Sequence, residues 1–253
     1  MSLPQPRLPM KLTLPNGDKV DGVPVAAVLS GGLDSATALA MALAGLVHHE
    51  GYPIFPVEAV SIYYGQRHAK ELNAAAEIAA HYGLKWTMLN ISFPQAVKDA
   101  SLLMQPEANL NIPKEEYERA SPPTYVPHRN IAILTAIAQH VYGREIYGAL
   151  GGWHAADIAY PDCRAEFLFR AQQALTCSGD LPFYVCAPLV ALTKLTIVRD
   201  GYNMKVPFEK TWSCYGGGEK ACGVCGTCRQ RLAAFEDLGL EDPIEYETRG
   251  DDE

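Results

Sequence analysis

Apolar and polar residues alternate along the chain in the pattern of a parallel α/β protein. Short apolar runs predict buried strands, and each is followed by a longer segment with apolar residues at helical spacing. The expected strands are 25–29, 57–63, 84–91, 145–150 and 183–187, and the expected helices are 35–47, 69–82, 130–142, 165–177 and 193–201, with a last helix ending at 238. This alternation predicts a doubly wound parallel sheet with helices on both faces and a ligand site beyond the carboxyl ends of the strands.

The same pattern divides the chain into three parts. Residues 1–24 precede the alternation, and Asn16-Gly17 between short apolar runs predicts a small β-hairpin there. Residues 25–205 form the α/β domain, in which the proline-containing stretch 92–126 predicts a long irregular loop. Residues 206–253 hold a segment rich in Cys and Gly and a helix, and we expect their acidic end, from Glu241-Asp242 onward, to be solvated.

The clearest chemical motif is the run 30–35, Ser-Gly-Gly-Leu-Asp-Ser, at the end of the first expected strand. Two glycines allow backbone N–H groups to approach phosphate oxygens, two serines add hydroxyl donors, and the helix that follows directs its positive end to the same place. The run lacks the lysine of a P-loop, which favours a loop that holds the pyrophosphate leaving from ATP, with AMP as product. Asp34 beside phosphates is expected to contact Mg²⁺. The alternative is a strand–helix turn without a ligand.

Four of the seven cysteines lie close together, which predicts a metal site. Cys214, Cys222, Cys225 and Cys228 offer four thiolates, enough to close a tetrahedron around Zn²⁺ in a structural site. An iron–sulfur cluster is the rival interpretation, and it is disfavoured because no proline follows the fourth cysteine. Outside this cluster, Cys177 and Cys186 are expected to be small core residues.

Two further polar runs follow expected strands or open helices. Arg129 offers a planar fork suited to a carboxylate or phosphate, with a surface ion pair as the alternative. In the run 153–164, Asp157 or Asp162 could accept hydrogen bonds from an amidine-like edge such as that of guanine, and Arg164 could hold an anion. His154 in this run is a catalytic candidate whose alternative role is structural hydrogen bonding.

Together these runs resemble the 7-cyano-7-deazaguanine synthase (QueC) family of pyrophosphate-loop ATP enzymes, which have an adenine nucleotide alpha hydrolase-like fold. The matching runs are Ser30–Ser35, Tyr64-Gly65-Gln66-Arg67-His68, Val126-Pro127-His128-Arg129-Asn130, Tyr160-Pro161-Asp162-Cys163-Arg164, Pro188-Leu189 with Leu192-Thr193-Lys194, and Trp212-Ser213-Cys214-Tyr215 with the three later cysteines. Two positions depart from the family pattern: His128 stands in place of Gly, and the segment from Asp157 to Tyr160 is about one residue short.

The resemblance implies a ligase that converts 7-carboxy-7-deazaguanine and ammonia to the nitrile and releases AMP and pyrophosphate. Its implied catalytic residues are Asp34, Lys194 and Arg129. Its implied ATP-binding residues are Ser30, Gly31, Gly32, Leu33, Asp34, Ser35, Tyr63 and Arg67. Its implied substrate-binding residues are Arg129, Asn130, Asp157, Tyr160, Asp162 and Arg164, and its implied Zn²⁺ ligands are the four clustered cysteines. A homodimer is also implied.

Composition narrows the class of protein. A hydrophobic content of 48% is that of an ordinary globular protein, and the net charge of −8 disfavours a long nucleic acid as partner. No apolar run is long enough to span a membrane and no signal peptide is recognisable, so we expect a cytoplasmic protein. Three alternatives stay open: an enzyme of the same loop type that couples the carboxylate to another amine and stops at an amide, a non-catalytic nucleotide-sensing domain, and a zinc-ribbon nucleic-acid binder.

Overall fold

Five parallel strands form the centre of the sheet in the computed structural model, which describes residues 10–13, 19–66, 69–105, 108–109, 112–113, 116, 122–154 and 160–249. They are β2 (Lys19–Val28), β4 (Tyr52–Tyr63), β5 (Trp86–Asn90), β6 (Gly148–Leu150) and β7 (Tyr184–Cys186). Their order is β5-β4-β2-β6-β7, and every neighbouring pair is parallel. The chain therefore winds outward from β2 in both directions, which confirms the doubly wound parallel sheet.

Two short antiparallel additions extend this sheet. β1 (Met10–Thr13) pairs with the first half of β2, and β3 (His48–His49) pairs with the start of β4. The turn expected at Asn16-Gly17 lies outside the described residues. β2 runs unbroken from the hairpin into the centre of the sheet, so the strand begins well before residue 25. β4 is also longer than expected, because its pairing with β2 skips Val57, and this bulge accommodates Pro56 within the strand.

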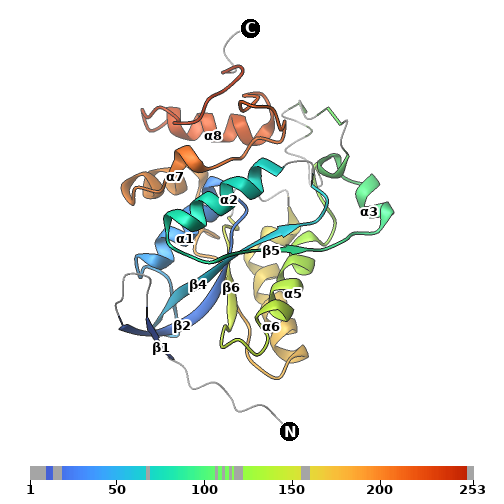
Figure 1. Cartoon of the computed structure of the whole chain (residues 1–253). Coiled ribbons are helices and arrows are strands. Elements are labelled where there is room, and N and C mark those ends of the chain that lie inside the picture. The colour runs from blue at the N-terminus through green and yellow to red at the C-terminus, as the bar shows by residue number, and fades with distance from the viewer. Residues whose placement is uncertain are drawn as a thin grey trace.

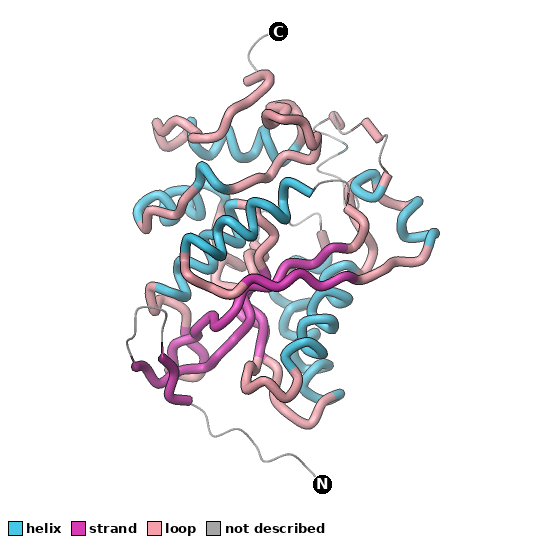
Figure 2. The backbone as a smooth tube through the Cα atoms, viewed as in Figure 1, coloured by secondary structure: helices cyan, strands magenta, loops and turns pink. Residues whose placement is uncertain are grey.

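Helices cover both faces of the sheet, as Figures 1 and 2 show. One face carries α1 (Leu33–Leu43), α2 (Ala69–His81) and α7 (Lys194–Asn203), and α8 (Gly226–Glu236) packs on α7. The other face carries α5 (Arg129–Val141) and α6 (Ala165–Ser178). Alternate residues of β2 enter the two cores: Val25 and Ala27 pack beneath α1, and Ala26 packs beneath α5.

The proline-containing stretch 92–126 is only partly irregular where the structure describes it. It contains the short helix α3 (Gln95–Asp99) and the 3₁₀ turn η1 (Leu102–Met104). Leu103 and Met104 pack against Val126 in a small apolar cluster beside the main core. Further 3₁₀ turns are η3 (Pro161–Cys163) and η4 (Phe208–Lys210). None of the described helices combines the length and apolarity that crossing a bilayer requires.

Two expectations about single residues are wrong. Asp242 is buried in an ion pair with Arg231 rather than solvated with the rest of the acidic end, since the guanidinium compensates its charge. Arg231 Nε donates to Asp242 Oδ2 at 2.6 Å, and Arg231 Nη1 donates to Thr211 Oγ1 at 2.6 Å. Cys177 is exposed, because it lies on the outer side of α6, whereas Cys186 is buried as expected.

Candidate active site

A cavity of about 260 Å³ opens at the carboxyl ends of β2, β4 and β6. Its walls come from the segments after these strands, from the N-terminal ends of α1, α2 and α5, and from the Cys-rich segment. Polar and charged lining residues include Ser30, Asp34, Ser35, Ser61, Tyr64, Gln66, Glu71, Arg129, Asn130, Ser213, Tyr215 and Thr227. The cavity therefore lies at the reversal of strand order, where open α/β sheets bind ligands.

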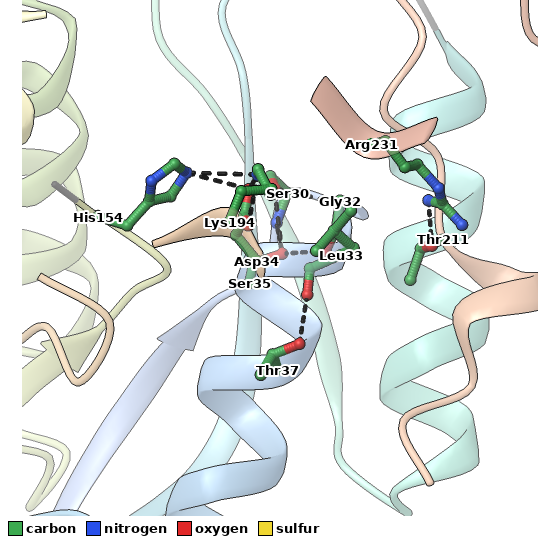
Figure 3. A network of polar contacts seen from close by, with 10 residues as sticks. All are labelled: Ser30, Gly32, Leu33, Asp34, Ser35, Thr37, His154, Lys194, Thr211 and Arg231. Carbon is green, nitrogen blue, oxygen red and sulfur yellow. Dashed lines mark hydrogen bonds and ion pairs between the residues drawn. The ribbon is translucent and has the colours of Figure 1, made fainter. Parts of the chain in front are cut away.

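The glycine loop after β2 is shaped by a close backbone approach. Gly31 has φ +85°, and a Cβ at this position would lie 2.1 Å from the backbone oxygen of Glu71 in α2. Only glycine fits there. The hydroxyl oxygens of Ser30 and Ser35 are 3.1 Å apart, and the N–H of Ser30 donates to Ser35 Oγ at 3.2 Å (Figure 3). Two hydroxyls and the N-terminus of α1 thus face one place in the cavity, an arrangement suited to an anion.

The segment after β6 closes against this loop. A Cβ on Gly152 would lie 2.6 Å from the backbone nitrogen of Ser35, so the backbones of the two segments touch. The pair Gly151-Gly152 directly follows the expected fourth strand, which is the signal that could have identified it from the sequence. A side chain at Gly152 would therefore displace the first turn of α1.

Asp34, Lys194 and His154 form a charged cluster at the start of α1 (Figure 3). Lys194 Nζ, at the start of α7, donates to both Asp34 carboxylate oxygens at 2.7 Å, and His154 Nε2 lies 3.5 Å from Asp34 Oδ2. Burial alone would raise the pKa of Asp34, but the charge of Lys194 and hydrogen bonds from His154 and Lys194 hold it well below its ordinary value. Asp34 is therefore an anion that faces the cavity with a cation beside it.

The opposite wall is formed around Arg129. Its Nη1 lies 3.5 Å from the hydroxyl oxygen of Tyr64, to which it donates. Burial would lower the pKa of Arg129, but nearby Tyr64, Cys163 and Asp162 raise it, so the guanidinium stays charged. Burial raises the pKa of Glu71, another lining residue, to about 7, although the charge of Arg129 opposes this shift. This wall of the cavity therefore carries a cation, Arg129, and a carboxyl group, Glu71.

Asn130 and Asp162 hold the start of α5. The N–H of Asn130 donates to Asp162 Oδ2 at 3.0 Å, and Asn130 Nδ2 donates to the backbone oxygen of Asp162 at 2.9 Å. Tyr160 shares a 2.7 Å hydrogen bond with Thr124. His128, the residue before α5, has φ +59°, a left-handed conformation that glycine adopts without strain. This geometry gives a physical reason for Gly at that position in the family pattern.

The structure brings part of the expected site together. The expected residues that line the cavity are Ser30, Gly32, Asp34, Ser35, Arg129 and Asn130. Lys194 forms an ion pair with one of them, Asp34. Gly31 and Leu33 shape the loop, whereas Tyr160 and Asp162 are buried beside α5 and Arg164 is exposed. Tyr63 is 40% exposed on β4, and Tyr64 lines the cavity in its place. Arg67 and Asp157 lie outside the described residues.

Several lining residues had no expected role. Glu71, Trp212, Ser213 and Tyr215 are among them. The last three lie in a run that carries the family resemblance, but their approach to the glycine loop depends on how the Cys-rich segment folds back. Trp212 donates its backbone N–H to the oxygen of Gly31 at 2.8 Å, which fixes this approach.

The four clustered cysteines meet the requirement for a metal site. Their sulfur atoms all lie within 4.8 Å of one another, where a tetrahedral Zn²⁺ site would need about 3.8 Å from Zn–S bonds of about 2.3 Å. Backbone N–H groups of Gly216 and Cys222 donate to Cys214 Sγ at 3.1 and 3.2 Å. The donor set therefore fits a thiolate-bound metal.

The strand order, the glycine loop and the cavity beside it define a pyrophosphate-loop α/β protein. The profile of a family described as "Queuosine biosynthesis protein QueC" matches residues 25–239. The chain belongs to this QueC family, which confirms the family identification from the sequence.

Named relatives agree with this assignment. A protein of Thermoplasma acidophilum named 7-cyano-7-deazaguanine synthase is 40% identical over 231 residues, covering 87% of this chain and 90% of the relative. One of the same name from Caldicellulosiruptor bescii is 38% identical over 222 residues, covering 87% and 96%. Among solved structures, an NMN synthetase from Francisella tularensis is 16% identical, with a TM-score of 0.41 over 88% of this chain and 79% of that one.

Proposed function

We propose that this protein is a ligase that converts 7-carboxy-7-deazaguanine and ammonia to 7-cyano-7-deazaguanine while ATP is split to AMP and pyrophosphate. The observation that carries the proposal is the match of residues 25–239 to the QueC family, with relatives of 38–40% identity named for this product. The cavity supports it, because an anion-binding glycine loop and a second cation, Arg129, face the same space.

The proposed reaction brings two anionic groups together in one cavity, the carboxylate of the substrate and the phosphates of ATP. A carboxylate resists attack by an amine, since its carbon is electron-rich and oxide is a poor leaving group. Transfer of AMP to the carboxylate supplies a leaving group, ammonia then gives the amide, and a second adenylation of the amide oxygen allows the nitrile to form. The protein contributes mainly by positioning the reactants and neutralising charge.

The position of each residue in the site indicates its proposed role in ATP binding. We assign the pyrophosphate to Ser30, Gly31, Gly32, Leu33 and Ser35, because their loop and the N-terminus of α1 offer hydroxyl and N–H donors. Lys194 neutralises phosphate charge beside Asp34. Asp34 would hold Mg²⁺, which supplies charge neutralisation between carboxylate and phosphates. Tyr63 and Arg67 stay predictions for the nucleotide.

The deazaguanine is proposed to bind on the α5 side of the cavity. Arg129 and Asn130 line it there, and Arg129 presents a guanidinium to an anionic group. Asp157, Tyr160, Asp162 and Arg164 stay predictions for the same substrate. Asp162 Oδ1 is buried and has no hydrogen-bond partner within the described ranges, which is consistent with a polar group that a ligand or neighbouring segment satisfies.

We propose a hairpin-bearing extension in residues 1–24, the nucleotide-binding domain in 25–205 and the metal-binding segment in 206–253. We also propose a cytoplasmic location without a membrane partner, because no apolar run of the sequence is long enough to span a membrane. The family resemblance supports a homodimer, and the net charge of −8 disfavours a nucleic-acid partner.

Zinc is proposed to hold the Cys-rich segment against the cavity. Replacing Cys225→Ser is expected to reduce bound zinc from about one ion per chain to a trace, because serine is a poor zinc ligand. Loss of about 2 kcal/mol would lower the melting temperature by about 4–8 °C. Metal analysis and thermal unfolding measure both effects.

The exposed Cys177 provides the control, since Cys177→Ser should retain zinc and stability. Iron with visible absorbance in the purified protein would favour the iron–sulfur interpretation, and full zinc content in Cys225→Ser would contradict the assignment.

Mass spectrometry after mixing the protein with Mg·ATP, ammonium and 7-carboxy-7-deazaguanine tests the proposed reaction. We expect a nitrile product together with AMP. A heterocycle of unchanged mass with no AMP formed would refute the proposal. A stable amide as the only product would instead support the alternative ligase, which the family assignment does not favour.

A further inference from the structure

Glu71 is a carboxyl group in the cavity wall that the proposed reaction has not yet used. It lies in the first turn of α2, and its backbone oxygen is the atom that excludes a side chain at Gly31. Its residue is partly exposed and lines the cavity. Within the part of the chain that the structure describes, its carboxyl group makes no hydrogen bond or ion pair. A half-buried acid next to the nucleotide loop is thus available to a small ligand.

The charged and titratable groups that face Glu71 come from two other elements. Arg129 of α5 and Tyr64, just after β4, both interact electrostatically with its carboxyl group. The neighbouring Lys70 is directed elsewhere, because its Nζ donates to the backbone oxygen of Glu219 at 2.6 Å. The pKa of Glu71 lies at about 7, so near neutral pH its carboxyl group can both take up and release a proton.

An enzyme that uses ammonia as its nucleophile requires a group that can accept a proton. In neutral water the dominant species is ammonium, which has no lone pair and cannot attack a carbon atom. An enzyme that uses ammonia must therefore remove a proton after the cation enters. Glu71 combines a negative charge, which attracts ammonium, with a place in the same cavity as the glycine loop that would hold the activated substrate.

We propose that Glu71 binds ammonium and accepts its proton, which delivers neutral ammonia to the adenylated carboxyl group. This inference rests on the proposed function. One N–H bond breaks, its electron pair stays on nitrogen, and the proton passes to a Glu71 carboxylate oxygen. The lone pair then forms the C–N bond, while the C–O bond to AMP breaks with its electron pair on the phosphate oxygen. The nitrogen loses a second proton to solvent as the amide forms, and Glu71 returns its proton to water.

The variant Glu71→Gln keeps the size of the side chain and removes the base. With ammonium chloride at neutral pH we expect nitrile formation to fall on the order of 10²-fold, the usual contribution of a positioned base. Exchange of labelled pyrophosphate into ATP, which depends on the carboxylate substrate alone, should remain near the wild-type rate. Raising the pH should reduce the defect, because free ammonia becomes more abundant.

Hydroxylamine, used as the nucleophile in place of ammonium, distinguishes a role of Glu71 in proton removal from any other role of this residue. It is largely neutral at pH 7 and needs no base, so Glu71→Gln should form the hydroxamate about as fast as the wild type. Glu77→Gln, an exposed acid on the same helix, should leave all three rates unchanged.

Equal loss of pyrophosphate exchange and hydroxamate would overturn the inference, because Glu71 would then act before nitrogen enters. An unimpaired nitrile rate in Glu71→Gln would overturn it as well. Absence of substrate-dependent exchange in the wild type would remove the proposed function, and this inference with it.

Discussion

Replacing Asp34→Asn is expected to lower the rate of AMP formation by about 10²–10³-fold, the effect of losing one preorganised electrostatic contact in an active site. Asp34 receives both hydrogen bonds from Lys194 Nζ at 2.7 Å and lies 3.5 Å from His154 Nε2. The amide keeps the shape of the side chain but removes its charge. Lys194 then loses its ion pair, and the proposed Mg²⁺ loses a ligand. AMP and nitrile are measured by mass spectrometry under saturating ATP.

Asp200→Asn is the matched control, because Asp200 lies at the surface of α7 and pairs with the exposed Arg199. It should keep the wild-type rate. Asp34→Asn should still unfold in one cooperative transition, at a lower temperature than the wild type because Lys194 loses its partner, and this transition separates loss of chemistry from loss of fold. A wild-type rate in Asp34→Asn would remove this carboxylate from the mechanism.

The largest expected effect on stability comes from Asp242→Asn, with a loss of about 3–5 kcal/mol in the free energy of unfolding. The side chains of Asp242 and Arg231 are each 1% exposed, and two hydrogen bonds of 2.6 and 2.8 Å join them. Without the carboxylate, a guanidinium would remain buried with no compensating charge. Urea unfolding measures the change.

Two further variants identify the cause. Arg249→Met breaks the exposed pair with Glu241 and should cost at most about 1 kcal/mol. The double variant Arg231→Met with Asp242→Leu removes both buried charges and should regain much of the stability that Asp242→Asn loses. A loss of less than about 1 kcal/mol in Asp242→Asn would contradict this account.

The parallel sheet could be predicted because its strands are continuous apolar runs, which arise when helices cover both faces. The length of the strands could not. Lys19 and Asp21 interrupt the apolar pattern at the start of β2, yet this part pairs with β1 in the hairpin, outside the main core. Likewise, Pro56 seemed to precede the second strand, but a bulge accommodates it inside β4.

The glycine loop could be predicted residue by residue because its chemistry is local. The rest of the cavity depends on register and on contacts between distant segments. Tyr63 and Tyr64 illustrate the first limit: successive residues at the end of β4 point in different directions, so a shift of one position exchanges surface for cavity. Glu71 and Asp242 illustrate the second, since their environments come from Arg129 and Arg231, far away in sequence.

The walls of the cavity come from segments that are synthesised at very different times. Ser30 emerges early in synthesis, Gly152 after the middle and Ser213 near the end, yet all three line one space. Contacts of such separation form late in folding, after the chain between them has been ordered. A nascent chain therefore cannot complete this cavity until almost the whole polypeptide has left the ribosome, and a product truncated before the Cys-rich segment would carry the glycine loop without the wall that Ser213 contributes.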